Sequence, residues 1–142
     1  MRSWPIFLLV FLGAGCVSAG ESVVGFPDGA SIRVEIADGL FEQAKGLAGR
    51  ETLSQEEGLL FLHGSPAIQR YWMKGMLIPI DIIWINGKTV EGYVQDAQPE
   101  PPPFTIYASP TPVDKVLEVS AGFVAAHRVN IGDTLDIRLA DE

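Results

Sequence analysis

The sequence predicts a small, mostly β (α+β) domain, built as a partly closed β-barrel with two or three short helices. Three observations predict this fold. Several short segments alternate apolar and polar residues, the pair Asn86-Gly87 joins two β-prone runs, and stretches with helical spacing are brief. After an N-terminal leader, 1–19, residues 20–142 have the length of one domain with a modest core.

The first part of the domain is expected to hold two strands with a short helix between them. Residues 31–37 alternate strictly, as in a half-buried strand whose apolar side chains share one face. Asp38 is placed to cap a short helix with apolar residues at helical spacing over 40–47. The apolar run 58–62 is bounded by polar and glycine residues and predicts a buried strand.

The second part adds strands over 69–74 and 78–85, a strand over 115–119, a brief helix over 121–127 and a final alternating strand over 134–139.

A hairpin is predicted where Asn86-Gly87 separates two β-prone runs, since both turn residues must accept positive φ in the favoured two-residue turn. If these two residues form the turn, Ile83 faces Val90 and Asp81 faces Gly92 on one side of the sheet.

The segment 96–112 is rich in proline, and we expect an extended loop with neither helix nor ladder pairing. A loop of this length inside a small domain is either a polar surface excursion or a lid over a binding site.

The N-terminus has the parts of a secretory signal peptide. A cationic start at 1–3 precedes an apolar run, 4–12, that is too short to span a bilayer. Val17-Ser18-Ala19 fits a cleavage site, so we expect cleavage after Ala19 and export to the periplasm or the extracellular space. Cys16, preceded by small residues, gives the alternative of a lipoprotein with a lipid anchor. We expect no transmembrane segment in the mature chain.

The net charge and the cysteine content exclude some classes of binding partner and of chemistry. The chain carries 18 acidic and 10 basic residues, a net charge of −8, and cleavage after Ala19 removes Arg2 and the single cysteine. An acidic surface repels phosphate backbones, so no nucleic-acid partner is expected. The mature chain then has neither a disulfide nor a thiol nucleophile.

Standard catalytic and cofactor motifs are lacking in the sequence. It has no Gly-x-Ser-x-Gly elbow, no phosphate-binding glycine loop and no His-Glu-x-x-His. His63 and His127 stand alone without the spacing of metal ligands, so neither a metal nor a cofactor is expected.

Four polar or aromatic residues are candidates for a site. Asp81 lies between apolar neighbours, where a buried carboxylate is costly unless it is paired or hydrogen-bonded. It is either a structural partner of a loop amide or basic side chain, or a carboxylate that lines a pocket. Trp72 and Lys74 share a strand face and form either a ligand wall or a charge-shielded edge. Arg50 follows a glycine-rich turn and is placed to pair with an acid.

Seven segments in order resemble one protein family across nearly the whole mature chain. They are Val34-Glu35-Ile36-Ala37, Gly46-Leu47-Ala48-Gly49-Arg50, Glu57-Gly58-Leu59-Leu60-Phe61, Tyr71-Trp72-Met73-Lys74, Ile78-Pro79-Ile80-Asp81-Ile82-Ile83-Trp84-Ile85, Val116-Leu117-Glu118-Val119-Ser120-Ala121-Gly122 and Val129-Asn130-Ile131-Gly132-Asp133. The chain is similar to the DUF192 family, also called UPF0127, whose function is unknown.

The resemblance implies a compact β-rich fold, often behind a signal peptide. Alternation in 115–119 predicts that the Glu118 side chain faces solvent, so only the resemblance makes Glu118 a candidate site residue. The chain departs from the family pattern at Gly75 and Met76, where relatives commonly have Asn and Thr, at Ala48, where many have Met, and in lacking a cysteine pair in the proline-rich loop.

Three functions follow from these residues. The leading one is a non-catalytic cell-envelope module that binds a small molecule or partner in a pocket lined by Trp72, Lys74, Asp81, Glu118 and Arg50. The first alternative is an acid/base enzyme, a hydrolase or lyase, that uses Asp81 with Glu118. The second is a structural partner of another envelope protein, with an exposed apolar patch and no pocket. We further expect Asp81 to form a polar cluster with Lys74, Arg50 or Glu118.

Overall fold

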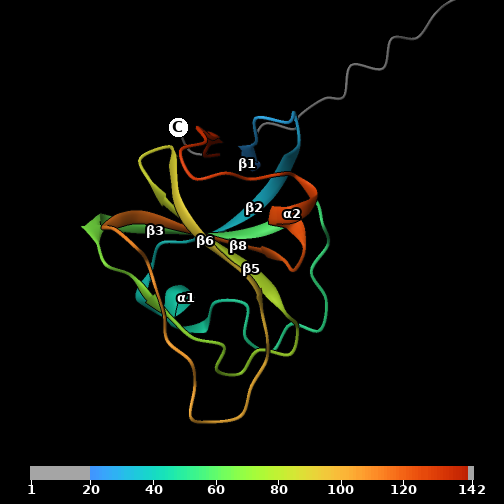
Figure 1. The fold of residues 1–142 in the computed structure, drawn as a ribbon, viewed down its shortest axis with the longest axis vertical. Helices are drawn as coiled ribbons and strands as arrows, with labels where there is room; N and C mark the ends of the chain where they lie inside the picture. The colour runs from blue at the N-terminus through green and yellow to red at the C-terminus, as the bar shows by residue number, and fades with distance from the viewer. Residues whose placement is uncertain (1–19, 141–142) are drawn as a thin grey trace, which may run out of the picture.

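The computed structural model describes residues 20–140, so the expected leader 1–19, its cleavage after Ala19 and the alternative anchor at Cys16 lie outside the described residues. Within residues 20–140 the chain is mostly β, with two short helices (Figure 1). The elements are β1 (Ser22–Gly25), β2 (Ser31–Ala37), α1 (Leu40–Lys45), β3 (Glu57–Ala67), β4 (Arg70–Tyr71), β5 (Ile80–Asn86), β6 (Thr89–Ala97), β7 (Tyr107–Ala108), β8 (Val113–Ser120), α2 (Phe123–Ala126) and β9 (Asp136–Arg138).

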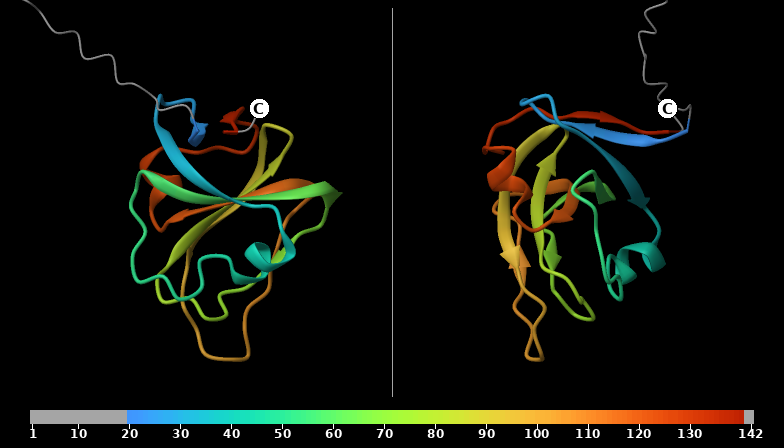
Figure 2. Two further views of the ribbon diagram at one scale, coloured as in Figure 1. Left: turned by 180° about the vertical axis from the view of Figure 1, so that it is seen from behind. Right: turned by 90° about the vertical axis from the view of Figure 1, so that its right-hand side faces the viewer.

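Seven strands form one curled sheet in the order β6-β5-β8-β3-β2-β1-β9, and β4 pairs with β7 in a separate ribbon. All neighbours are antiparallel except β2 and β3. One bridge, Thr89 with Thr134, and nearby main-chain bonds bring the start of β6 to the segment before β9. The edge strands β6 and β9 are not joined by a ladder, so the sheet is a half-barrel; the mostly β fold with short helices is confirmed, but the barrel is less closed than expected. In both views of Figure 2, β1 and β9 lie at one end and α1 toward the other.

The two faces of the sheet carry separate apolar cores. One face buries residues such as Ile83 and Leu117 beneath α2, which contributes Phe123. The other face buries residues such as Trp84 and Val116. Paired residues on neighbouring strands share a face, and side chains alternate along each strand. Because β8 lies between β5 and β3 and is covered on both faces, its alternation does not separate inside from outside.

The hairpin forms, but its register differs from the expected one. Asn86 pairs with Thr89 and Ile85 with Val90, so the turn is Gly87-Lys88 rather than Asn86-Gly87. Gly87 has φ 62°, whereas Asn86 has no positive φ, which fits a turn whose first central position requires glycine. Irregularities after Trp84 and Ile80 shift the remaining pairs, so that Gly92 faces Trp84 instead of Asp81.

For several other elements the predicted type is confirmed, but the bounds or the pairing differ. The alternation over Ser31–Ala37 is a strand as expected, with Ile32 and Val34 buried. The strand expected over 69–74 shortens to Arg70–Tyr71. The proline-rich segment does carry ladder pairing, since its Tyr107–Ala108 pairs with β4. The expected loop therefore docks on the chain through a short strand.

Helix α1 also differs from the prediction. Its N-cap is Gly39, with no side-chain cap, so Asp38 does not cap it. Leu40 and Phe41 are exposed, and only Leu47, beyond the helix end, is buried. The apolar spacing over 40–47 thus belongs to a short helix and the turn that follows, not to one amphipathic helix.

Candidate functional site

A pocket of about 340 Å³ opens between α1, β3 and the segment that begins with β4. We call it the Glu118 pocket. Helix α1 forms one wall, held in place by Gln43, whose side-chain amide donates to the carbonyls of Ala37 (3.2 Å) and Leu62 (2.8 Å). These bonds fix the helix to the end of β2 and the middle of β3, because a helix of six residues has too few hydrogen bonds of its own to be stable alone.

Glu118 lies at the floor of this pocket on the central strand β8. The residue is only 5% exposed, and its Oε2 is buried without a hydrogen-bond partner among the described residues. The expectation that it faces solvent is wrong, because β8 is covered on both faces. Burial raises the pKa of the Glu118 carboxyl to about 8, so the group holds a proton at neutral pH.

Gly46, just after α1, leaves space beside this carboxyl. Its φ of 50° and ψ of −136° are a backbone conformation that favours glycine. A Cβ there would lie 3.4 Å from Phe61 Cζ and 3.9 Å from Glu118 Oε2. A side chain at this position would therefore reduce the volume directly over the acid.

An aromatic wall stands beside Glu118. The Tyr71 ring packs edge-on against Phe61 (5.0 Å between centroids) and Trp84 (5.6 Å), and its hydroxyl lies 3.0 Å from His63 Nε2. Burial, with the nearby Glu118 carboxyl, raises the pKa of Tyr71, and burial lowers the pKa of His63. The wall thus presents a neutral phenol and a neutral imidazole at physiological pH.

The mouth of the pocket is basic. Lys45, Arg70 and Lys74 all line it, and none of the three forms an ion pair with an acidic side chain of residues 20–140. The Lys74 ammonium lies 5.4 Å from the centroid of the Trp72 ring, a cation–π geometry. The centroid of the Trp72 ring in turn lies 6.0 Å from that of Phe104 in the proline-rich segment.

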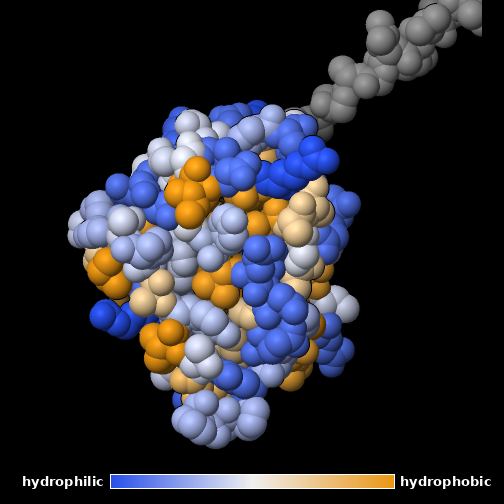
Figure 3. Space-filling model, viewed as in Figure 1, coloured by the Kyte–Doolittle hydropathy of each residue, from blue (hydrophilic) through white to orange (hydrophobic). Residues whose placement is uncertain are grey.

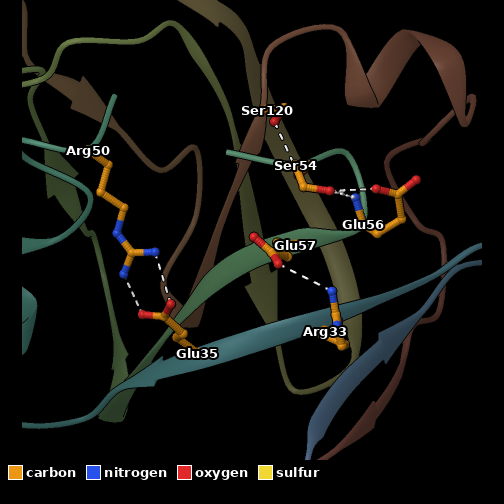
Figure 4. Close-up of polar contacts among 7 residues, drawn as sticks. All are labelled: Arg33, Glu35, Arg50, Ser54, Glu56, Glu57 and Ser120. Carbon is orange, nitrogen blue, oxygen red and sulfur yellow. Dashed lines mark hydrogen bonds and ion pairs between the residues drawn. The ribbon is translucent and has the colours of Figure 1, made fainter. Parts of the chain in front are cut away.

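The structure brings together three of the five residues predicted for the site, Trp72, Lys74 and Glu118. Arg50 points elsewhere: it makes a bidentate pair with Glu35, one bond being 2.9 Å (Figure 4). This pair raises the pKa of Arg50 and lowers that of Glu35.

Arg50 lines a different cavity of about 350 Å³, next to β2 and the start of β3. There Arg33 pairs with Glu57 at 3.2 Å, so each of the two arginines drawn in Figure 4 is paired with an acid. The cavity offers no buried polar atom without a partner among the described residues, unlike the Glu118 pocket.

Asp81 is fully buried on the other face of the sheet and does not line the Glu118 pocket. Its carboxylate accepts three backbone N–H bonds, from Asp96 (2.8 Å), Gly122 (3.3 Å) and Val124 (2.8 Å). The expected cluster with Lys74, Arg50 or Glu118 does not form within residues 20–140. Asp81 instead holds the start of α2 and the end of β6 to β5, the loop-amide role that the sequence left open.

Sequence reasoning missed most of the remaining lining residues. Tyr71 precedes Trp72, so strict alternation places it on the opposite face, yet β4 ends there and both side chains reach the pocket. The sequence gives no sign that the His63 side chain contacts the Tyr71 hydroxyl. In the described part of the chain, no group of three or more His, Cys, Asp or Glu residues could hold a metal ion. Lys45 and Gly46 carry no local signal, whereas alternation along 70–74 places Arg70 on one face with Trp72 and Lys74, and all three line the pocket. No helix among residues 20–140 is long and apolar enough to cross a bilayer.

Comparison with known proteins agrees with this fold. The chain is similar to a crystallised protein of unknown function from Novosphingobium aromaticivorans DSM 12444, with a TM-score of 0.75, 32% identity, and coverage of 82% of this chain and 83% of that one. It is also similar to a crystallised Sinorhizobium meliloti 1021 protein described as a "putative transcription regulator", with a TM-score of 0.74, 28% identity, and coverage of 83% and 92%.

No functionally curated protein matches the chain. The family model DUF192, described as "Uncharacterized ACR", matches residues 23–137, which include every lining residue of the Glu118 pocket. The chain therefore belongs to the DUF192 family.

Proposed function

We propose that this chain is an exported binding module that holds a small ligand in the Glu118 pocket. The observation that carries the proposal is the Glu118 carboxyl, which is buried at the pocket floor with Oε2 unpartnered among the described residues. A concave site with aromatic walls and a few convergent polar groups is the usual form of a small-molecule site. A perturbed acid inside such a site is a further pointer to function.

A contribution to folding stability does not explain why a glutamate occupies position 118. An unpartnered buried polar group costs about 1–3 kcal/mol, and an apolar side chain of similar volume would avoid that cost. The rest of this core is filled by apolar residues such as Val116, two positions earlier on β8. A ligand that accepts or donates a hydrogen bond at Oε2 would remove the cost and gain affinity from it.

The acid/base alternative with two carboxylates has no geometric support. Glu118 pairs with Ile82 across β5 and β8, and Asp81 is the neighbour of Ile82 along β5, so the two carboxyls project from opposite faces. The alternative of a purely structural partner is also less well supported. It calls for an exposed apolar patch without a pocket, whereas apolar side chains on the face in Figure 3 lie in separate groups among polar ones.

A role in transcription, suggested by the name of the Sinorhizobium protein, is not extended to this chain. With a net charge of −8, the chain is poorly suited to bind a phosphate backbone. A location in the cell envelope, periplasmic or extracellular, is supported by the leader-like sequence of 1–19, with lipidation at Cys16 as the alternative.

The proposal is tested by a fragment screen on ¹⁵N-labelled protein, with Glu118→Leu as the variant and Glu51→Gln as the matched control, since Glu51 is an exposed acid outside the pocket. We expect fragments that shift the amides of Gly46 and Tyr71 in the wild type and in E51Q, with these shifts lost in E118L. Fragments that shift only residues outside the pocket, or that bind E118L equally well, would contradict the proposal.

A further inference from the structure

The distribution of charge around the Glu118 pocket narrows the class of ligand. Three of the ten basic residues of the chain, Lys45, Arg70 and Lys74, line this one pocket, although acidic residues outnumber basic ones by 18 to 10. Among residues 20–140, Glu118 at the floor is the only acid that lines the pocket. Glu42, on α1, lines the adjacent cavity and not this one.

These three cations form no ion pairs, unlike most of the other basic side chains of residues 20–140. Arg33, Arg50, Lys115 and Arg138 each form an ion pair with an acid, whereas the three at the pocket form none among residues 20–140. Unpaired like charges gathered around one opening repel one another, and an anion placed between them relieves that repulsion. Lys74 is also positioned, because its ammonium lies over the Trp72 ring.

The depth of the pocket adds a second requirement. The cations are exposed at the mouth and Glu118 is buried at the floor, and the Tyr71 and Phe61 rings line the same pocket. A ligand that reaches both ends needs an anionic group, a body that packs on aromatic rings, and a polar oxygen at the far end. A bare inorganic anion would satisfy the mouth and leave Glu118 unpartnered.

We propose that the ligand of the Glu118 pocket is a small organic anion whose carboxylate, sulfate or phosphate is held by Lys45, Arg70 and Lys74, and whose hydroxyl, ether or carbonyl oxygen meets Glu118. This inference rests on the proposed binding function and specifies its chemistry. Charge-assisted hydrogen bonds of guanidinium and ammonium groups to such anions are about twice as strong as neutral ones.

The test uses pairs of probes that share a body and differ at one group, charged in one and neutral in the other: 4-hydroxybenzoate against 4-hydroxybenzamide, and glucuronate against glucose. Dissociation constants come from amide shifts at Gly46 and Tyr71. In the wild type the anion of at least one pair should bind about 10-fold more tightly than its neutral partner. In the double variant Arg70→Gln with Lys74→Gln that preference should fall to near unity, while Lys88→Gln, at an exposed lysine in the hairpin turn, should keep it.

The outcomes separate this inference from the proposed function. If in both pairs the neutral probe binds as tightly as its anion and E118L abolishes the binding, the pocket is a binding site but not one selective for anions, and the inference is overturned alone. If the preference survives in the double variant, the cations named here are not its source and the inference is again overturned. If no probe of either charge shifts the pocket amides, the proposed function is contradicted with it.

Discussion

Asp81 and Glu118 come from neighbouring strands but project from opposite faces of the sheet, because Glu118 pairs with Ile82, the residue after Asp81. The two buried acids also differ in their partners. Asp81 accepts three backbone N–H bonds, whereas Oε2 of Glu118 has no partner among the described residues. One carboxyl therefore stabilises the fold, and the other is left available to a ligand.

Replacing Asp81 with Ala should destabilise the domain by about 3 kcal/mol or more, because the change leaves three backbone donors near β5 without their acceptor. Urea unfolding of the wild type and the variant measures the difference. Asp38→Ala is the control, since Asp38 is exposed and does not cap α1, and it should stay within about 0.5 kcal/mol. A D81A protein as stable as D38A would contradict the structural role.

Glu118 should make stability depend on pH in the opposite sense to an ordinary paired carboxylate. Its folded pKa of about 8 lies above the ordinary value of 4.5, so the folded chain keeps a proton that the unfolded chain releases. The contribution of Glu118 to the free energy of unfolding is therefore highest below pH 4.5 and falls as the pH rises toward 8. The expected slope in this window is roughly 1 kcal/mol per pH unit.

Glu118→Gln removes this titration and isolates it from all other groups. The stability of E118Q relative to the wild type should rise steadily between about pH 5 and pH 8. Glu118→Leu should be more stable than the wild type at pH 8 by about 1–3 kcal/mol, since it also removes the unpartnered polar group. A difference between E118Q and the wild type that stays constant with pH would show that Glu118 is not a perturbed acid.

Tyr71 should resist ionisation. Burial and the nearby Glu118 carboxyl hold its pKa above the usual range. Alkaline titration followed by tyrosinate absorbance should therefore give the same change up to about pH 11 in the wild type and in Tyr71→Phe. If the variant instead loses about a third of the signal, as expected for one of three equally titrating tyrosines, the raised pKa of the half-buried Tyr71 is contradicted.

Export is tested by the mass of the secreted protein. When residues 1–142 are expressed in a Gram-negative host, the intact mass should correspond to an N-terminus at Gly20 with no lipid, because Val17-Ser18-Ala19 has the small residues of a cleavage site. A diacylglyceryl adduct on Cys16 would overturn this prediction and place the protein on a membrane surface.

Much of the fold could be predicted from local pattern, because alternation and turn residues are local signals. Residues 31–37 form the expected strand, and a hairpin forms next to Asn86-Gly87. The register could not be predicted, since it depends on which two residues form the turn and on two irregularities between β5 and β6, neither of which has a local signal in the sequence. Barrel closure likewise depends on sheet curvature, which no single segment encodes.

The site was predicted less well than the fold. Alternation failed at Glu118 because that rule assumes one solvated face, and β8 has none. Asp81 was a reasonable candidate from its apolar neighbours, yet its partners are backbone groups, which leave no trace in the identity of a side chain. Lys45, Arg70 and Tyr71 meet at the pocket only through the docking of α1 and β4, so their grouping is a property of the tertiary structure.

The most direct test of the central claim is a ¹³C NMR titration of the glutamate carboxyl carbons, with the Glu118 resonance assigned by its absence in E118Q. We predict a midpoint near pH 8 for Glu118 in the free protein, as expected for a neutral acid buried at the floor of the pocket. A midpoint at or below 4.5, the value of a solvated glutamate, would contradict the claim that this carboxyl is buried and unpartnered.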